Sequence, residues 1–211
     1  DVPPVNSFRR PPRLSLAIRG VGGQGNLFFG KVLAQVAFLA GYDDRNILKG
    51  ETHGMAQMGG PVISTFGCGE VFSPALVPGT ANVLIAMEKA EALRPGFLDL
   101  LEPGGTALMA DTRILPHGLK PEAYPSDEAI AAQLEGYRVV TVDVLNIALS
   151  LGDHKGRCAN VAMLGVLSTL PPFDVVPEAV WLQALKGISR KPALWDLNHA
   201  AFMAGRGMQK G

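Results

Sequence analysis

A glycine-rich turn between two apolar segments constrains the fold of this 211-residue chain more than any other feature. The turn reads GVGGQG over residues 20–25. An apolar run over residues 14–18 precedes it and predicts a strand, and a helical pattern over residues 26–40 follows it. Asn26 suits the N-cap of that helix, and Gly41 suits the position just past its C-terminus. A strand that turns through glycines into a helix is typical of an open α/β sheet.

The rest of the chain repeats this alternation of apolar runs and helical patterns. The sequence predicts strands at 47–48, 61–68, 81–86, 106–110 and 137–142, and helices at 88–101, 126–134, 143–151, 160–170, 177–186 and 192–204. Residues 50–60 and most of 111–125 are expected to be loops. The alternation favours an α/β fold, a three-layer α/β/α Rossmann-like domain with a mostly parallel sheet.

We expect a single domain over residues 14–211, because a domain usually contains about 100–200 residues. The preceding segment contains Pro3, Pro4, Pro11 and Pro12, which oppose regular secondary structure. We therefore interpret residues 1–13 as an irregular N-terminal arm.

Charge and cysteine content exclude several classes of function. The chain has 19 basic and 19 acidic residues, whereas a nucleic-acid-binding protein needs a surplus of Lys and Arg on one face. No apolar run reaches the ~18 residues that span a bilayer, so no membrane partner is expected. Cys68 and Cys158 are too few for the four thiolates of an iron–sulfur cluster, and the four histidines are scattered, so no metal site is predicted. Two lone cysteines fit a reducing compartment and a cytoplasmic location.

The glycine-rich turn is a candidate ligand site. Its glycines let a ligand approach the backbone, and the following helix N-terminus offers free N–H groups to a phosphate or carboxylate. The candidate residues are Gly20, Gly22, Gly23, Gln24, Gly25 and Asn26. Two alternatives stay open: a tight turn packed against the chain itself, and a dinucleotide site. Asp43 and Asp44 lie about 20 residues on, where a ribose-binding acid is expected, but they precede the next apolar run instead of ending it.

A second loop, over residues 51–60, has unusual composition for a simple connection. Gln57 is suited to hydrogen-bonding a polar ligand, and Met55 and Met58 to adaptable apolar contact with a ring or a partner. The candidate residues are His53, Gly54, Met55, Gln57, Gly59 and Gly60. If the loop follows a parallel strand, it faces the glycine-rich turn. The alternative is a subunit-contact loop with a structural histidine. No nucleophile or acid is paired with His53, so no catalytic residue is predicted.

Taken together, these segments resemble the gamma subunit or gamma domain of 2-oxoacid:ferredoxin oxidoreductases, and in particular the indolepyruvate (aryl-pyruvate) type. The similarity covers nearly the whole chain after residue 13. It rests on GVGGQG at 20–25, HGMAQMGG at 53–60, the run from Thr80 to Ile114, RCANVAMLGVLSTL at 157–170 and LNHAAFMAG at 197–205. One departure is Met58, which stands where the family commonly has Arg; an apolar residue there would suit an aromatic oxoacid.

The resemblance implies a subunit of a complex that oxidatively decarboxylates 2-oxoacids to acyl-CoA and passes electrons to ferredoxin. Such a complex uses thiamine diphosphate, Mg, coenzyme A and iron–sulfur clusters, and the alpha- and beta-type thiamine-binding and iron–sulfur subunits would hold them. This chain holds no cofactor alone in that interpretation: Gly152-Asp153-His154 is the nearest string to a thiamine-diphosphate motif and lacks its second Gly. The chain would be inactive alone and would shape the assembly and the coenzyme A or substrate cleft. The alternatives are an NAD(P)-binding Rossmann dehydrogenase and a purely structural subunit.

Overall fold

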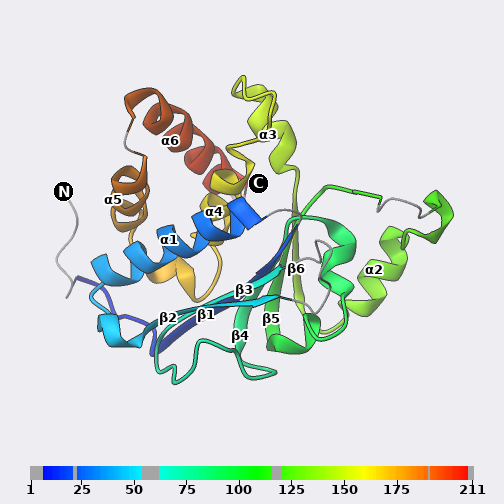
Figure 1. The fold of residues 1–211 in the computed structure, drawn as a ribbon, viewed down its shortest axis with the longest axis horizontal. Helices are drawn as coiled ribbons and strands as arrows, with labels where there is room; N and C mark the ends of the chain where they lie inside the picture. Colours follow the sequence, from blue (N-terminus) through cyan, green and yellow to red (C-terminus); the bar gives the residue numbers. More distant parts are fainter. Residues whose placement is uncertain (1–6, 21–22, 54–61, 116–119, 190, 209–211) are drawn as a thin grey trace.

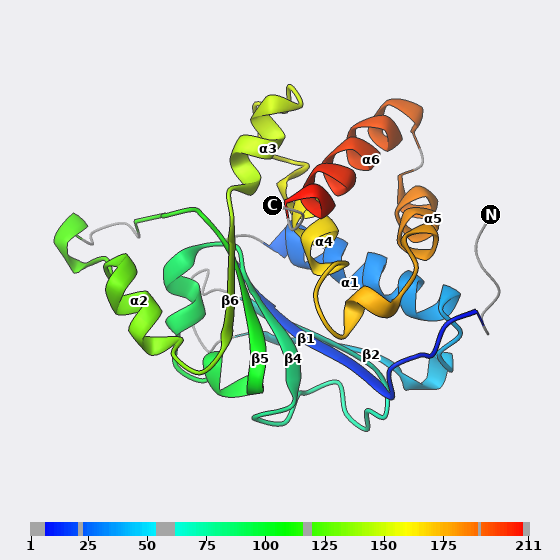
Figure 2. The same cartoon turned by 180° about the vertical axis from the view of Figure 1, so that it is seen from behind.

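The structure is a computed structural model that describes residues 7–20, 23–53, 62–115, 120–189 and 191–208. These residues form a six-stranded sheet with helices on both faces (Figures 1 and 2). The strands are β1 (Arg13–Arg19), β2 (Ile47–His53), β3 (Val62–Gly69), β4 (Ala81–Ala86), β5 (Leu101–Ala110) and β6 (Arg138–Val142), in the spatial order β2-β3-β1-β4-β5-β6. β1, β4, β5 and β6 are parallel, whereas β3 runs antiparallel to both β1 and β2. The predicted α/β class and the mostly parallel sheet are therefore confirmed.

The two faces of the sheet are covered unequally. One face carries α1 (Gly23–Leu39), α3 (Val144–Ser150), α4 (Ala159–Leu167), α5 (Glu178–Ile188) and α6 (Pro192–Gly207) (Figure 1). The other carries α2 (Asp127–Gln133) and two short 3-10 helices, η3 (Lys89–Leu93) and η4 (Leu98–Leu100). Further 3-10 turns are η2 (Asp44–Asn46), η5 (Pro121–Ala123) and η6 (Phe173–Val175). The buried apolar residues divide accordingly into a large core under α1, α4, α5 and α6 and a smaller one under η3, η4 and α2.

The predicted helix at 88–101 is wrong. This stretch forms η3 and η4, and Leu101 already begins β5. Pro95 cannot donate a helical hydrogen bond, and Gly96 has φ +79°, so the pair prevents a continuous helix. β5 also begins earlier than predicted, with a break in its pairing: Ala81 of β4 lies opposite Leu101, but Val83 lies opposite Thr106.

Two other boundaries differ from the prediction at the sheet end that carries the glycine-rich turn. α1 begins at Gly23, so Asn26 lies inside the first turn of the helix and is not its N-cap. β2 extends from Ile47 to His53, so more than half of its 7 residues lie in the stretch predicted as a loop. Gly41 does end α1 as predicted: it has φ +83°, and its N–H donates to the Phe38 carbonyl.

The helices α4 and α6 touch backbone to backbone. A Cβ atom on Gly165 of α4 would lie 2.1 Å from the Phe202 carbonyl oxygen, and one on Gly205 of α6 would lie 2.0 Å from the Ala162 carbonyl oxygen. The Trp181 ring of α5 packs beside Phe202, with ring centroids 6.3 Å apart. The segments 157–170 and 197–205 that carry part of the family resemblance thus form a close-packed helix pair.

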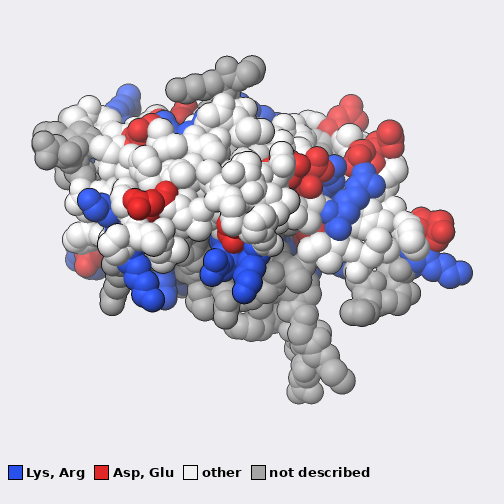
Figure 3. Space-filling view, turned by 90° about the horizontal axis from the view of Figure 1, so that it is seen from above, with Lys and Arg blue, Asp and Glu red and all other residues white. Residues whose placement is uncertain are grey.

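The surface over the helical layer carries interspersed basic and acidic side chains among many uncharged ones (Figure 3). Among the described residues, none of the helices combines the length and the apolar character that crossing a bilayer requires.

Candidate functional site at the glycine-rich end of the sheet

The two glycine-rich segments are anchored at the same end of the sheet. β1 ends at Arg19, which lies opposite Ile63 of β3, and Ile63 lies opposite Thr52 of β2. β1 and β2 are thus separated only by β3, which corresponds to about 10 Å across the sheet. α1 begins at the same end, at Gly23. We predicted that the glycine-rich turn and the second loop lie close together. The positions of the strand ends that precede them, Arg19 and His53, are consistent with this prediction.

Several predicted site residues lie outside the described residues. These are Gly22, Gly54, Met55, Gln57, Gly59 and Gly60, together with Met58. Gly23, Gln24, Gly25 and Asn26 form the first turn of α1, and His53 is the last residue of β2. A role of these residues in binding a ligand stays a prediction.

Gly20 makes its close contact with the chain itself. A Cβ atom at Gly20 would lie 2.8 Å from Cβ and 3.1 Å from Cγ of Met87, which directly follows β4. The Met87 N–H also donates to the Arg19 carbonyl at 2.9 Å. Close packing between the ends of β1 and β4 therefore accounts for glycine at this position, as the alternative of a self-packed turn requires. The sequence interpretation missed Met87, although it follows the predicted strand 81–86 directly.

The ends of β1 and β4 form the point at which the chain connections diverge. β1 leads into α1 on one face of the sheet, and β4 leads into η3 on the other (Figures 1 and 2). In open α/β sheets, ligands bind in the crevice outside the carboxyl ends of strands at such a point. Here Gly20, the half-buried Met87 and the start of α1 lie at that point.

A buried carboxylate, Glu91 of η3, contacts the end of β1. Glu91 accepts hydrogen bonds from the guanidinium groups of Arg19, at the end of β1, and of Arg94, the latter at 3.1 Å. The neighbouring Lys89 pairs with Asp111 at 2.6 Å, and this bond raises the pKa of Lys89. These ion pairs tie η3 to the ends of β1 and β5.

A second buried carboxylate, Glu88, anchors the segment after β5. It accepts hydrogen bonds from the Tyr124 hydroxyl, from the Glu91 N–H at 3.1 Å and from the Ile114 N–H at 3.3 Å. Burial and the bond to Glu88 raise the pKa of Tyr124. With three donors bound, Glu88 holds structure together and is not a free general base.

Asp43 is not placed to bind a ribose. It caps η2 at the opposite end of β2 from His53, and its carboxylate accepts hydrogen bonds from the Arg45 N–H at 3.0 Å and from the Arg45 guanidinium at 2.6 Å. The hydrogen bond from the Arg45 side chain lowers the pKa of Asp43 to about 2. This location argues against the dinucleotide alternative.

The two thiols are packed in the core, and Asp153 accepts hydrogen bonds from backbone N–H groups ahead of α4. Burial raises the pKa of Cys68 to about 12 and that of Cys158 to about 11. Asp153 is buried; its carboxylate accepts hydrogen bonds from the Cys158 N–H at 2.7 Å and the Lys155 N–H at 3.3 Å. Within the described ranges, no group of three or more His, Cys, Asp or Glu side chains is arranged to hold a metal ion.

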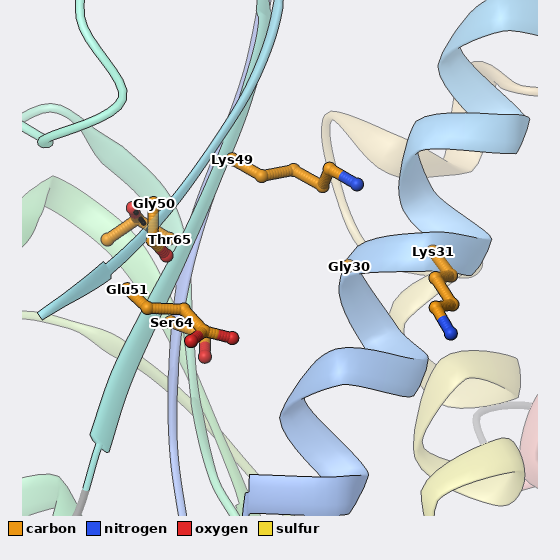
Figure 4. Close-up of a pocket in the computed structure, with 7 residues that line it drawn as sticks. All are labelled: Gly30, Lys31, Lys49, Gly50, Glu51, Ser64 and Thr65. Atoms are coloured by element: carbon orange, nitrogen blue, oxygen red, sulfur yellow. Dashed lines mark hydrogen bonds between the residues drawn. The ribbon is translucent and has the colours of Figure 1, made fainter. Parts of the chain in front are cut away.

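A cleft of about 260 Å³ opens between α1 and the β2–β3 pair, and the sequence interpretation selected none of its residues as a site (Figure 4). Its lining residues are Gly30 and Lys31 of α1, Lys49, Gly50 and Glu51 of β2, and Ser64 and Thr65 of β3. Lys49 extends from β2 toward α1 (Figure 4).

Comparison with known proteins places this chain in a family. Residues 15–208 match the family model described as pyruvate ferredoxin/flavodoxin oxidoreductase. The indolepyruvate oxidoreductase subunit IorB of Archaeoglobus fulgidus is 35% identical over 201 residues, which cover 92% of this chain and 94% of that protein. The subunit of the same name from Thermococcus kodakarensis is 32% identical over 198 residues, covering 90% and 93%.

Solved structures share the fold at lower identity. The pyruvate oxidoreductase subunit PORC from Thermotoga maritima has a TM-score of 0.67 at 19% identity, over 93% of this chain and 97% of that one. The 2-oxoglutarate:ferredoxin oxidoreductase from Magnetococcus marinus, solved with 2-oxoglutarate, coenzyme A and succinyl-CoA, has a TM-score of 0.64 at 18% identity. It matches over 95% of this chain but only 32% of its own.

The chain therefore belongs to the pyruvate ferredoxin/flavodoxin oxidoreductase family. Within it, the chain is a gamma-type subunit of a 2-oxoacid:ferredoxin oxidoreductase, which confirms the resemblance seen in the sequence.

Proposed function

We propose that this subunit serves a complex that oxidises aryl pyruvates such as indolepyruvate to acyl-CoA, with ferredoxin as electron acceptor. The substrate class is supported by relatives named indolepyruvate oxidoreductase subunit IorB, which are 30% to 35% identical over nearly their whole length. The apolar Met58, where the family commonly has Arg, is consistent with an aromatic substrate.

The observation that carries a direct role for this chain is the shared sheet end of its two glycine-rich segments. β1, which leads toward the N-terminus of α1 at Gly23, and β2, which ends at His53, are separated by one strand. A phosphate or carboxylate of coenzyme A or of the oxoacid, bound at the helix N-terminus, would be within reach of the second segment. In this proposal His53 and Gln57 orient that group, and the chain shapes the cleft without carrying out the chemistry.

The redox chemistry is assigned to partner subunits. Thiamine diphosphate, when bound with Mg in the complex, supplies the stabilised carbanion that decarboxylation needs. The residues that the structure describes do not fit that group or an iron–sulfur cluster: the Asp153 carboxylate is committed to the Cys158 and Lys155 amides, and Cys68 and Cys158 are buried in separate segments. We therefore propose alpha- and beta-type thiamine-binding and iron–sulfur partners, and a cytoplasmic location consistent with the two free thiols.

The ligand role is tested with Gln57→Ala in the assembled complex. Loss of a hydrogen bond to a charged group is expected to raise the KM for coenzyme A or for the oxoacid by at least about tenfold. Gln35→Ala, on the exposed side of α1, is the matched control and should leave both KM values unchanged. Unchanged KM values in Gln57→Ala would remove the ligand role and leave subunit contact.

A purely structural subunit is the second candidate, and the contact between Gly20 and Met87 favours it. It predicts that Gly25→Val leaves turnover unchanged in a complex that still assembles. Size-exclusion chromatography of the variant complex, followed by a turnover assay, distinguishes this outcome from the proposed ligand role.

A further inference from the structure

The cleft between α1 and the β2–β3 pair is separate from the glycine-rich turn. Gly30 lies seven residues beyond the start of α1 at Gly23, which corresponds to about 10 Å along the helix. Lys49 and Glu51 alternate with Gly50 along β2, and they lie opposite Phe66 and Ser64 of β3. Phe66 belongs to the large core beneath α1, so this face of both strands is directed toward the helix.

Lys49 is held across the cleft beside α1. A Cβ atom on Gly30 would lie 3.5 Å from Cδ of Lys49, so the lysine stem runs along the helix at its glycine (Figure 4). Lys31 of α1 also lines the cleft. Within the described part of the chain, neither ammonium group forms an ion pair. With Glu51 as the carboxylate of the lining, the described lining has a net charge of +1.

Ser64 provides the observation that points to a ligand. It is only 8% exposed, it lines the cleft, and its Oγ atom is buried with no hydrogen-bond partner. Leaving such a group unsatisfied costs about 1–3 kcal/mol. Thr65, the next residue, differs: its hydroxyl donates to the Pro74 carbonyl at 2.7 Å. The Ser64 hydroxyl lies beside the Glu51 carboxylate, and Lys49 extends across the same cleft toward α1 (Figure 4). A hydroxyl and an ammonium group are both donors of the kind that bind oxyanions.

We propose that this cleft binds the oxyanion group, phosphate or carboxylate, of a small molecule, with Lys49 and Ser64 as its principal donors and Lys31 adding positive charge. The site rests on Lys49, Ser64 and the cleft itself, and it does not depend on the glycine-rich turn or on Gln57. A negative result here therefore leaves the proposed function intact, and the converse also holds.

The test is a nuclear magnetic resonance titration of the full chain with inorganic phosphate and, separately, with phenylpyruvate, at constant ionic strength. Saturable shifts of the Gly30 and Gly50 amide signals are expected, and the probe with the lower Kd identifies the phosphate or carboxylate source. Lys49→Met should raise that Kd about fivefold or more, and Ser64→Ala about threefold or more. Glu51→Gln should lower it, because a negative charge beside the anion is removed. Lys155→Met, in the α3–α4 loop, is the control and should change nothing.

Ser64→Ala also separates binding from folding. Because it removes an unsatisfied buried hydroxyl, it should keep or raise the thermal stability while weakening binding. The proposal is overturned if neither probe gives saturable shifts at Gly30 and Gly50. It is equally overturned if Lys49→Met and Ser64→Ala bind as the native chain does, or if Glu51→Gln weakens binding. Saturable binding by the free chain that disappears in the assembled complex would show that a partner subunit covers the cleft, which also overturns the proposal.

Discussion

Glycine permits two different kinds of close contact in two regions of this subunit. At the α4–α6 contact, Gly165 and Gly205 face carbonyl oxygens of the opposite helix, about 2 Å from where a Cβ would stand. At the end of β1, Gly20 faces the Met87 side chain, with 2.8 Å available. The first contact joins two backbones that cannot adjust, whereas the second meets a side chain. Both regions lie in segments that carry the family resemblance. A glycine pattern in the sequence therefore indicates that another group lies close to the backbone, but it does not show whether that group is a backbone or a side chain.

The largest effect is expected when a methyl group is added at the contact between α4 and α6. Gly165→Ala or Gly205→Ala should lower the free energy of unfolding by about 3 kcal/mol or more, the upper end of overpacking costs. For a chain of this size the Tm should fall by roughly 10 °C. Thermal unfolding followed by circular dichroism measures the change, and native-like stability in both variants would show that the two helices are not in backbone contact.

A smaller effect is expected at the sheet end. Gly20→Ala should cost about 1–3 kcal/mol, because the new methyl group meets Met87. In a double-mutant cycle, Met87→Gly should recover part of that loss by removing the Cβ that causes the clash. Urea unfolding of the four chains in the cycle provides the coupling energy. Strict additivity would mean that something other than Met87 occupies the space.

The two buried thiols provide a pH test of the sheet and of the helical layer, since Cys68 lies in β3 and Cys158 immediately precedes α4. Their pKa values are raised from 9.0 to about 12 and about 11, so the folded chain binds more protons than the unfolded chain above pH 9. Stability is therefore complete below pH 9 and decreases as the pH rises, by at most about 1.4 kcal/mol per pH unit for each thiol. Urea unfolding between pH 7 and pH 10.5 measures the slope. Cys158→Ala should remove its share, and a slope equal to that of the native chain would contradict the assignment.

The smallest effect has the opposite sign and serves as the control for the helix contact. Gly187 lies in α5, and nothing lies within 4 Å of a Cβ built on it. Gly187→Ala should raise the free energy of unfolding by about 0.5–1 kcal/mol through helix propensity. A loss of stability here would show that glycine tolerance in this chain cannot be judged from the space around each Cβ.

Local patterns predicted much of the fold. β4 and the N-cap Ser126 of α2 were predicted as observed, and β1 differs from its prediction by one residue at each end. The prediction of secondary structure failed where the local sequence pattern was compatible with two kinds of element. Apolar residues over 88–101 have helical spacing, but Pro95 and Gly96 divide them into two 3-10 turns. Gly50 obscured the strand pattern of β2, whose existence depends on pairing with β3.

The candidate site was predicted only in part. The glycine-rich turn follows from a local strand–turn–helix pattern, and so its position was correct. The contact between Gly20 and Met87, and the cleft with Lys49 and Ser64, depend on tertiary neighbours that are 67 and 15 residues apart in the chain. The spacing of apolar residues within one segment does not predict contacts between residues so far apart in the chain.

The unequal covering of the two sheet faces has a consequence for the behaviour of the subunit in acid. The face that carries α2, η3 and η4 is held by ion pairs of carboxylates. Asp127, which begins α2, pairs with Lys89 and with Arg113, and the hydrogen bond from Lys89 lowers the pKa of Asp127. A carboxylate with a lowered pKa stabilises the fold at neutral pH and loses that contribution as the pH falls through its folded value. Most of the helical face is held by apolar packing, which does not titrate, but the hydrogen bond from the Cys158 N–H lowers the pKa of Asp153 there as well. Acidification is therefore expected to weaken the anchors of α2 and the Asp153 cap before α4, while the apolar contacts of the helical layer persist.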